Sequence, residues 1–144
     1  MKLVIQRVKK ASVTIDNMHY TSIGMGILCF VGFCSGDNDI DFSWAINKLF
    51  NLKIFNNNSL VDLDLELLIV SQFTLFGSLK KGNKPSWSKA AQPIVARDLY
   101  DQFINMAKSR KIVDIKTGVF GADMKVNSLN DGPFTLIVDT KNLD

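Results

Sequence analysis

Three polar side chains inside an apolar run, residues 68–76, could do chemistry together. They are Ser71, Gln72 and Thr74, with Phe73 between them. Hydroxyl and amide groups can hold a carbonyl substrate, and a hydroxyl can attack it when a base is adjacent. β-Branched and aromatic residues fill the rest of the run, which predicts a strand. Because side chains alternate along a strand, Ser71 and Phe73 should share one face, and Gln72 and Thr74 the other.

Polar groups in such a run must be hydrogen-bonded or line a cavity, because burying one unpaired costs about 1–3 kcal/mol. The alternative is that Ser71 and Thr74 lie on a solvent-facing edge, and the run alone does not decide. A second stretch bears on the choice, residues 130–135, which read Asn-Asp-Gly-Pro-Phe-Thr. Taken alone, that stretch is typical of a turn that opens the last strand.

The usual hydrolytic residues are scarce. His19 is the only histidine, and no cysteine or second histidine lies near it in the sequence, so no metal site is expected. A Ser-His-Asp triad would have to recruit the same residue, and no motif suggests one. We expect no cofactor, and any catalysis must proceed without metal or imidazole.

Positive charge gathers beside the central run, although the net charge is only +3. Residues 67–97 contain no aspartate or glutamate, and they carry Lys80, Lys81, Lys84, Lys89 and Arg97. A patch of one sign can attract the phosphates of a polyanion. A lysine-rich loop that is merely solvated remains the alternative.

Length and composition predict a single domain over residues 1–144, of which 47% are hydrophobic and 22% charged. No apolar run reaches the roughly 18 residues of a membrane span, and the first residues supply no signal-peptide core. A cytoplasmic location is therefore expected. Cys29 and Cys34 should lie roughly 16 Å apart if their run is a strand, too far for a disulfide, so reduced thiols are expected.

The pattern of elements predicts an α+β fold with a largely antiparallel, barrel-like sheet and two main helices. The first helix should follow residue 38, and its apolar stripe is Phe42, Ala45, Ile46, Leu49 and Leu52. The second should begin at Pro93 and end near residues 110–111, and its stripe is Val95, Leu99, Phe103 and Met106.

Short strands account for most of the remaining chain. Besides the central run they are expected at residues 2–8, 12–15, 18–23, 27–33, 112–116, 124–129 and 134–138. Turns are expected at residues 16–17 and 56–59, and a polar, basic loop at 77–88. Residues 60–67 alternate apolar and acidic residues and should lead directly into the central strand.

Four segments in this order resemble the signatures of the D-aminoacyl-tRNA deacylases, also called D-tyrosyl-tRNA deacylases. They are residues 4–8 (Val-Ile-Gln-Arg-Val), 71–75 (Ser-Gln-Phe-Thr-Leu), 117–124 (Thr-Gly-Val-Phe-Gly-Ala-Asp-Met) and 130–135. The likeness runs nearly end to end. It implies a homodimer that hydrolyses the ester between a D-amino acid and the terminal ribose of tRNA, and that removes glycine mischarged on tRNA-Ala.

The resemblance also implies roles for individual residues. Gly132 and Pro133, joined by a cis peptide bond, would enter the partner's pocket and turn their carbonyls toward the substrate's α-carbon. An L side chain would then be rejected. Arg7 would brace this loop. Phe120 and Met124 would line the pocket for the terminal adenosine, although plain core packing is the alternative for both.

Within the central run, the residues implied to be catalytic are Ser71, Gln72, Phe73 and Thr74. The Phe73 N–H would hold the ester carbonyl, Gln72 would order the pocket, and the ribose 2′-hydroxyl would assist the attacking water. Thr74 has no base beside it in the sequence, so we do not expect it to act as a nucleophile.

Lys80, Lys81 and Lys84 are the expected tRNA contacts. The family's Arg-Pro-Ser-Phe is here replaced by Lys84-Pro85-Ser86-Trp87, and a lysine cannot make arginine's bidentate phosphate contact. Two alternatives remain, namely an esterase that depends on Thr74 or Ser71, and a non-catalytic tRNA-binding module.

Overall fold

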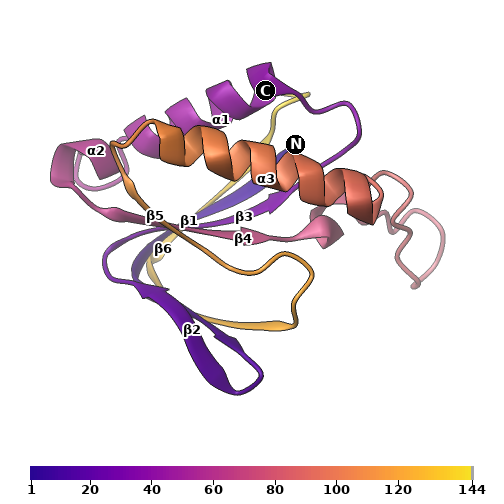
Figure 1. Ribbon diagram of the computed structural model, residues 1–144, viewed down its shortest axis with the longest axis horizontal. Coiled ribbons are helices and arrows are strands. Elements are labelled where there is room, and N and C mark those ends of the chain that lie inside the picture. The colour runs from indigo at the N-terminus through magenta and orange to yellow at the C-terminus, as the bar shows by residue number, and fades with distance from the viewer. Residues whose placement is uncertain (144) are drawn as a thin grey trace.

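A computed structural model describes residues 1–143 as one curved, six-stranded sheet with two long helices over one face (Figure 1). β1 (Lys2–Ile15) organises the sheet, because its first half pairs with β3 (Gly26–Gly32) and its second half with β2 (Met18–Ile23). β6 (Met124–Asp139) runs along the other side of β1. β4 (Glu66–Ser71) and β5 (Asp114–Thr117) extend the sheet beyond β3.

The α+β expectation is confirmed. All three pairings of β1 are antiparallel, whereas β3–β4 and β4–β5 are parallel. The sheet is barrel-like, since β2 curls round to approach β4 and β5. No helix in residues 1–143 has the length and apolar character needed to cross a membrane.

The two predicted helices are α1 (Asp39–Asn51) and α3 (Pro93–Ser109), and both pack on the same face of the sheet (Figure 1). α1 begins at a capping box, in which the Asn38 side chain accepts a hydrogen bond from the Ile40 N–H and Asp41 accepts one from the Asn38 N–H. Phe33, Phe42 and Phe103 meet edge to face in the core between the helices and the sheet.

The predicted stripe of α3 is wrong in part. Val95 is 42% exposed, and the buried residues of α3 are Ala96, Tyr100, Phe103, Ile104 and Ala107. Two of these buried residues are alanines, which a stripe of large apolar residues leaves out. A stripe drawn only through large residues therefore misplaces the buried face by about one position.

Two predicted strand breaks are absent. Residues 2–8 and 12–15 belong to one continuous strand, β1, and residues 124–129 and 134–138 belong to β6. The two strands pair along their lengths, with register irregularities between Gln6 and Val8 and between Val8 and Lys10. The Gly132–Pro133 stretch therefore forms an irregularity within an edge strand, where proline is tolerated, instead of a turn. The predicted turn at Asp16 and Asn17 is confirmed, with φ of 52° and 59°.

Residues 60–67 do not alternate in a strand as predicted. α2 (Leu60–Leu63) intervenes, and β4 begins only at Glu66. The cause is a second capping box, in which the Asp62 carboxylate accepts a hydrogen bond from the Ser59 N–H at 2.8 Å and the Ser59 hydroxyl accepts one from the Asp62 N–H. This Ser-x-x-Asp spacing was present in the sequence as a helix-start signal.

The central strand is shorter than predicted. β4 ends at Ser71, and Phe73–Phe76 form a 3₁₀ turn (η1). Gly32, the last residue of β3, makes room for it, because a Cβ there would lie only 2.8 Å from the Gln72 carbonyl oxygen. The predicted alternation therefore fails beyond Ser71, and Phe76 is buried while Phe73 is 54% exposed.

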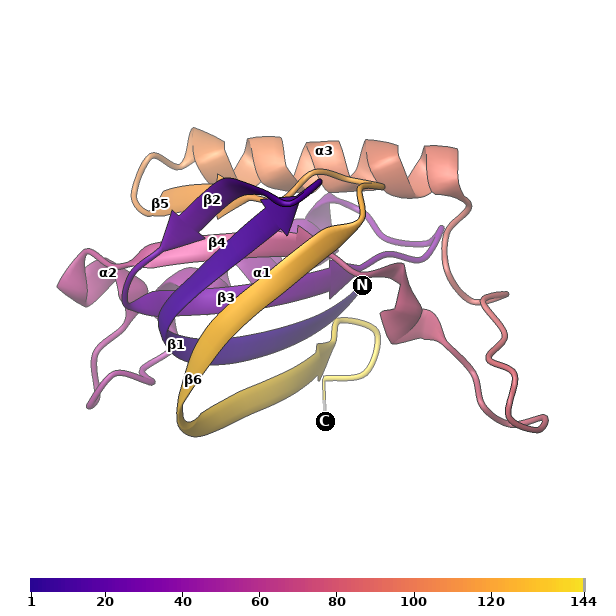
Figure 2. The same ribbon diagram turned by 90° about the horizontal axis from the view of Figure 1, so that it is seen from below.

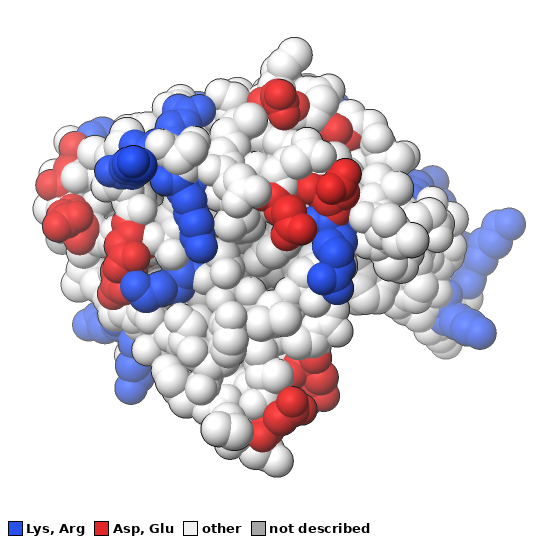
Figure 3. Space-filling view, viewed as in Figure 1, with Lys and Arg blue, Asp and Glu red and all other residues white. Residues whose placement is uncertain are grey.

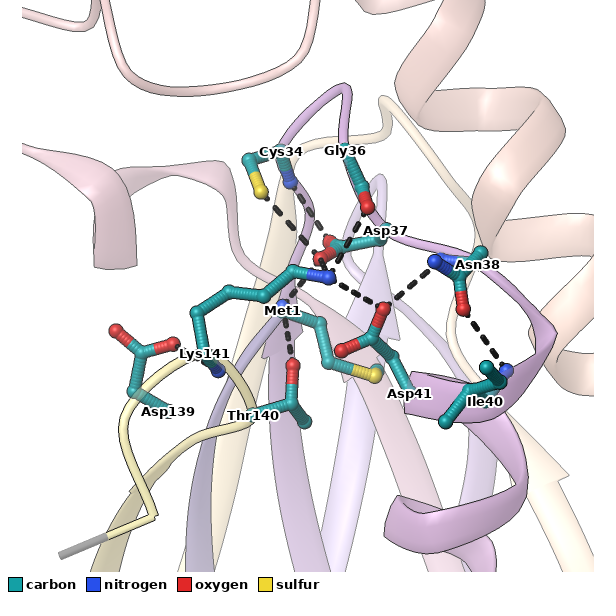
Figure 4. Close-up of polar contacts among 10 residues, drawn as sticks. All are labelled: Met1, Cys34, Gly36, Asp37, Asn38, Ile40, Asp41, Asp139, Thr140 and Lys141. Carbon is teal, nitrogen blue, oxygen red and sulfur yellow. Dashed lines mark hydrogen bonds and ion pairs between the residues drawn. The ribbon is translucent and has the colours of Figure 1, made fainter.

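A buried polar cluster fixes the loop that follows Gly32 (Figure 4). The Asp37 side chain is fully buried and accepts hydrogen bonds from the Cys34 N–H and the Met1 nitrogen. Lys141 donates to Asp41 at 2.6 Å and to the Gly36 carbonyl at 3.0 Å. Burial alone would raise the pKa of Asp41, but hydrogen bonds from Lys141 and the Asn38 N–H hold it below its usual value.

Candidate active site

A cavity of about 610 Å³ opens where β4 ends and α3 begins. None of its lining residues is charged, and most are apolar or aromatic. They are Phe30, Val70, Ser71, Gln72, Phe73, Trp87, Ala90, Ala91, Gln92, Pro93, Ala96, Phe120, Gly121, Ala122, Met124 and Val126. A cavity of this size and character suits a flat, weakly polar group such as a nucleobase.

Ser71, Gln72 and Phe73 line the cavity, and Thr74 follows them without lining it. The Gln72 N–H continues the β3–β4 ladder by donating to the Val31 carbonyl at 2.7 Å. Its side-chain amide donates to the Thr74 hydroxyl oxygen. The N–H groups of Phe73 and Thr74 are the first two of the 3₁₀ turn, so they have no partner within it. Neither N–H donates to another residue among residues 1–143, so the turn presents two unused backbone donors.

Neither hydroxyl has a base. Among residues 1–143, the only side chain that hydrogen-bonds Thr74 is Gln72, and Ser71 has no side-chain hydrogen bond. His19 lies in β2 and does not line the cavity. No group of three or more potential metal ligands occurs in the described part of the chain. Positioning by the backbone is the chemistry that this end of the cavity can offer.

Phe120 and Met124 both line the cavity. Phe120 also packs against the helix-side core, and its ring centroid lies 5.5 Å from that of Tyr100. The Tyr100 hydroxyl is buried without a partner among residues 1–143, and burial raises its pKa to about 12. Gly118 admits the Met124 sulfur, because a Cβ at Gly118 would lie 2.5 Å from it. The two residues thus serve the cavity wall and the core together.

Arg7, Gly132 and Pro133 come together in a separate place. Arg7 Nε donates to the Asp131 carbonyl at 3.0 Å, and its guanidinium lies 5.2 Å from the Phe134 ring centroid. Its Nη1 donates to the Ile54 carbonyl. Gly132 and Pro133 are exposed and joined by a cis peptide bond. Arg7 therefore anchors the chain on both sides of the exposed dipeptide.

This Gly-Pro cluster is far from the cavity of its own subunit. Ser71 lies in register with Leu3, whereas the Gly-Pro stretch lies beside Arg7, four residues further along β1. That offset is roughly 13 Å along the strands, and the three strand spacings from β4 to β6 add roughly 14 Å across them. The two clusters are thus on the order of 20 Å apart.

The three predicted tRNA-contact lysines, Lys80, Lys81 and Lys84, are exposed on the loop at 77–88. Lysine and arginine atoms project from this part of the molecule at the right edge of Figure 3, with no acidic atoms beside them in that view. A two-way bridge between Ser78 and Ser86 closes the base of the loop, with both N–H···O distances 2.9 Å. The loop joins the cavity through Trp87, whose ring packs at 5.3 Å against Phe73.

Sequence reasoning missed several cavity residues, among them Phe30, Ala91 and Gln92. Phe30 was part of a predicted strand, and nothing in its spacing showed that it faces a cavity. Ala91 is fixed by its N–H, which donates to the Phe33 carbonyl at 2.9 Å. Two glycines could have indicated the close packing around the cavity. Gly32 and Gly77 lie where the chain passes close to Gln72 and Trp87.

Comparison with known proteins gives a family match over nearly the whole chain. The family described as D-Tyr-tRNA(Tyr) deacylase matches residues 4–139. Proteins named D-aminoacyl-tRNA deacylase are 46% identical in Flavobacterium psychrophilum, 47% in Cytophaga hutchinsonii and 46% in Bacteroides thetaiotaomicron. Each alignment covers 99% of this chain and 99% of the relative.

Two solved structures have the same fold. One, titled c-Myc DNA Unwinding Element Binding Protein, is 35% identical with a TM-score of 0.88, over 96% of this chain and 98% of that one. The other, titled as a probable eukaryotic D-amino acid tRNA deacylase, is 20% identical with a TM-score of 0.84, over 95% and 97%. The family match over nearly the whole chain and the identities near 46% show that this chain belongs to the D-Tyr-tRNA(Tyr) deacylase family.

Proposed function

We propose that this protein hydrolyses the ester bond of D-aminoacyl-tRNA and releases the free D-amino acid and tRNA. The observation that carries the proposal is the uncharged cavity ending at a backbone turn with two free N–H donors, in a chain of this family. An aminoacyl ester is already activated. Its hydrolysis therefore needs an oriented substrate and a donor for the developing oxyanion more than it needs an acid or base.

Each residue of the site has a specific role in this proposed hydrolysis. The Phe73 N–H holds the ester carbonyl, and Gln72 fixes the Thr74 hydroxyl beside it. The ribose 2′-hydroxyl of the substrate assists the attacking water, since neither Ser71 nor Thr74 has a base to activate it. Phe120 and Met124 hold the terminal adenine, where stacking contributes about 1–3 kcal/mol. Lys80, Lys81 and Lys84 attract the tRNA backbone.

The working enzyme is a homodimer in which each subunit completes the other's site. Gly132 and Pro133 are exposed and on the order of 20 Å from their own cavity, so they serve the cavity of a second copy. The same edge strand carries an apolar contact surface. Ile137, 81% exposed, lies in register with Val4, which lies in register with Phe30. Figure 2 shows this side of β1 and β6 with no helix in front of it.

Chirality is then selected by exclusion. Fixed carbonyls at Gly132 and Pro133 face the substrate's α-carbon, so a D side chain points to open space and an L side chain meets backbone. Glycine has no side chain to exclude, and it is also released. Each tenfold of discrimination needs about 1.4 kcal/mol, and a clash with a rigid backbone supplies several such factors.

The direct test follows ester loss from D-tyrosyl-, L-tyrosyl- and glycyl-tRNA. Wild type should hydrolyse the D and glycyl esters and spare the L ester. Arg7→Met removes the hydrogen bonds to the Asp131 and Ile54 carbonyls, so its D/L ratio should fall. Comparable wild-type rates on D- and L-tyrosyl-tRNA would refute the exclusion of the L side chain. Binding of tRNA without any ester loss would favour a non-catalytic binding module.

A mixing experiment tests the shared site. Ala122→Trp fills the cavity, and Gly132→Ala disturbs the loop, because its Cβ would lie 2.9 Å from Arg7 Nη2 at a φ of +135°. Ala122→Trp alone should be inactive, whereas Gly132→Ala alone should hydrolyse L- as well as D-tyrosyl-tRNA. In a refolded equal mixture, about half of the Gly132→Ala subunits pair with a partner whose Gly-Pro loop is intact, so the rate on the L ester per Gly132→Ala subunit should fall by about half. An unchanged rate on the L ester in a mixture that contains mixed dimers would contradict the sharing of sites.

A further inference from the structure

Arg97 lies against the wall of the cavity without an acidic partner. Its Cζ is 5.2 Å from the centroid of the Phe120 ring, and its Nη2 is 3.7 Å from the position of a Cβ on Gly121. Phe120, Gly121 and the neighbouring Ala96 all line the cavity. No carboxylate among residues 1–143 forms an ion pair with Arg97, although Asp98 and Asp101 follow it on α3.

Arg97 supplies a positive charge, which the cavity lining itself lacks. The lining has no charged side chain, so it can accept a base and a sugar but cannot neutralise the phosphate attached to them. A phosphate on such a ligand must remain in water at the edge of the cavity. Arg97 is exposed, and a guanidinium offers the planar fork of donors that pairs with phosphate oxygens.

We propose that Arg97 binds the phosphate on the 5′ side of the nucleotide whose base enters the cavity. This inference rests on the proposed function, because the nucleotide is the terminal adenosine of the substrate tRNA. The contact fixes how far that nucleotide enters, and so sets the position of the ester relative to the turn at Phe73. Stacking on Phe120 holds the guanidinium at this edge before the ligand arrives.

The competing account is that Arg97 only supports the Phe120 ring. The two accounts predict different ligand dependence. Loss of a phosphate contact weakens ligands that carry a phosphate and leaves other ligands unaffected. Loss of support for Phe120 weakens every ligand that stacks in the cavity, with or without a phosphate.

The experiment compares adenosine with adenosine 5′-monophosphate, titrated at low salt into wild type, Arg97→Met, Arg97→Lys and Lys108→Met. Arg97→Met keeps an unbranched chain over Phe120 while removing the charge. Lys108→Met removes one charge near the other end of α3, roughly 16 Å away along the helix. Binding is measured by calorimetry, so no turnover is required.

Wild type should bind the monophosphate about tenfold more tightly than adenosine. Arg97→Met should abolish that difference without weakening adenosine, Arg97→Lys should keep part of it, and Lys108→Met should keep all of it. Equal weakening of both ligands by Arg97→Met, or no effect on either, would overturn the proposal. An Arg97-dependent preference in a protein that spares D-tyrosyl-tRNA would support this contact and reject the proposed function, whereas hydrolysis without the preference would reject only the contact.

Discussion

Gly32 lets β3 pass close to the turn at Phe73–Phe76, which carries the oxyanion donor in the proposed mechanism. A Cβ added there would lie 2.8 Å from the Gln72 carbonyl oxygen and 3.3 Å from both Leu75 Cβ and Phe76 Cδ2. Ordinary contact begins at 3.4 Å, so in Gly32→Ala the turn must move by about 0.6 Å or β3 must yield. The φ of Gly32 lies outside the left-handed region, which makes the perturbation steric alone.

The two consequences have different sizes. Overpacking of this kind costs about 1–3 kcal/mol, which for a chain of this length lowers Tm by roughly 3–10 °C. The rate of hydrolysis should be affected more strongly than the stability, because a misplacement of about 1 Å can cost about 100-fold in rate. A shift of about half that distance at the Phe73 N–H should lower kcat/KM for D-tyrosyl-tRNA by about tenfold.

The assay measures initial rates of D-tyrosyl-tRNA hydrolysis at 25 °C, well below Tm, alongside thermal melts. Gly36→Ala is the matched control, because nothing lies within 4 Å of its added Cβ, and it should retain wild-type rate and stability. If Gly32→Ala melts lower but keeps kcat/KM within about twofold of wild type, the turn does not position the reacting carbonyl. An equal loss of rate in Gly36→Ala would show that the whole loop, and not the contact with Gln72, is responsible.

Four further outcomes are expected. Thr74→Ala should keep substantial activity, whereas tRNA ending in 2′-deoxyadenosine should be hydrolysed far more slowly; the reverse pattern would favour a threonine-dependent esterase. Hydrolysis should survive EDTA, and a loss restored by zinc would refute the substrate-assisted mechanism. Lys141→Met should lower Tm by about 3 °C at pH 7, and the gap should narrow as the pH falls below about 4. Asp41 has a lowered pKa in the folded state, so its contribution to stability is lost as acid protonates it, and a gap that does not change between pH 7 and acid would contradict this. Gly26→Ala places a Cβ 1.9 Å from the Glu66 carbonyl oxygen and should cost about 3 kcal/mol or more, which a two-state denaturant titration can contradict.

Local chemistry made several elements predictable. Pro93 at the first position of α3, a helix that begins after residue 38 and the turn at Asp16–Asn17 were all expected from neighbouring residues, and the structure has each of them. In these cases the backbone groups involved find their partners within three or four residues. The missed helix at Leu60–Leu63 belongs to the same class, because its Ser59–Asp62 cap is equally local.

The failures have a different physical origin. Phe73–Phe76 consist of good strand residues, and they form a 3₁₀ turn because β3, their neighbour in the ladder, ends at Gly32. β1 is continuous because β6 pairs along it. In both places a partner distant in sequence overrides the intrinsic preference of the segment, and a single sequence carries no record of that partner.

The arrangement of the site illustrates the same limit most fully. The resemblance implies that Gly132 and Pro133 act on the same substrate as Ser71–Thr74. In a single subunit, however, the register of β1 with β3 and β6 separates the two groups. Motif order along a chain fixes neither which strand edge is free nor which way it faces. Since β6 pairs only with β1 and carries both the exposed dipeptide and Ile137, a second copy can reach the Gly-Pro stretch without disturbing the cavity of the first subunit. In the proposed homodimer, the turn that holds the ester and the loop that selects the hand come from different subunits, so a variant that weakens association should lose selection of hand even though every residue of its cavity is unchanged.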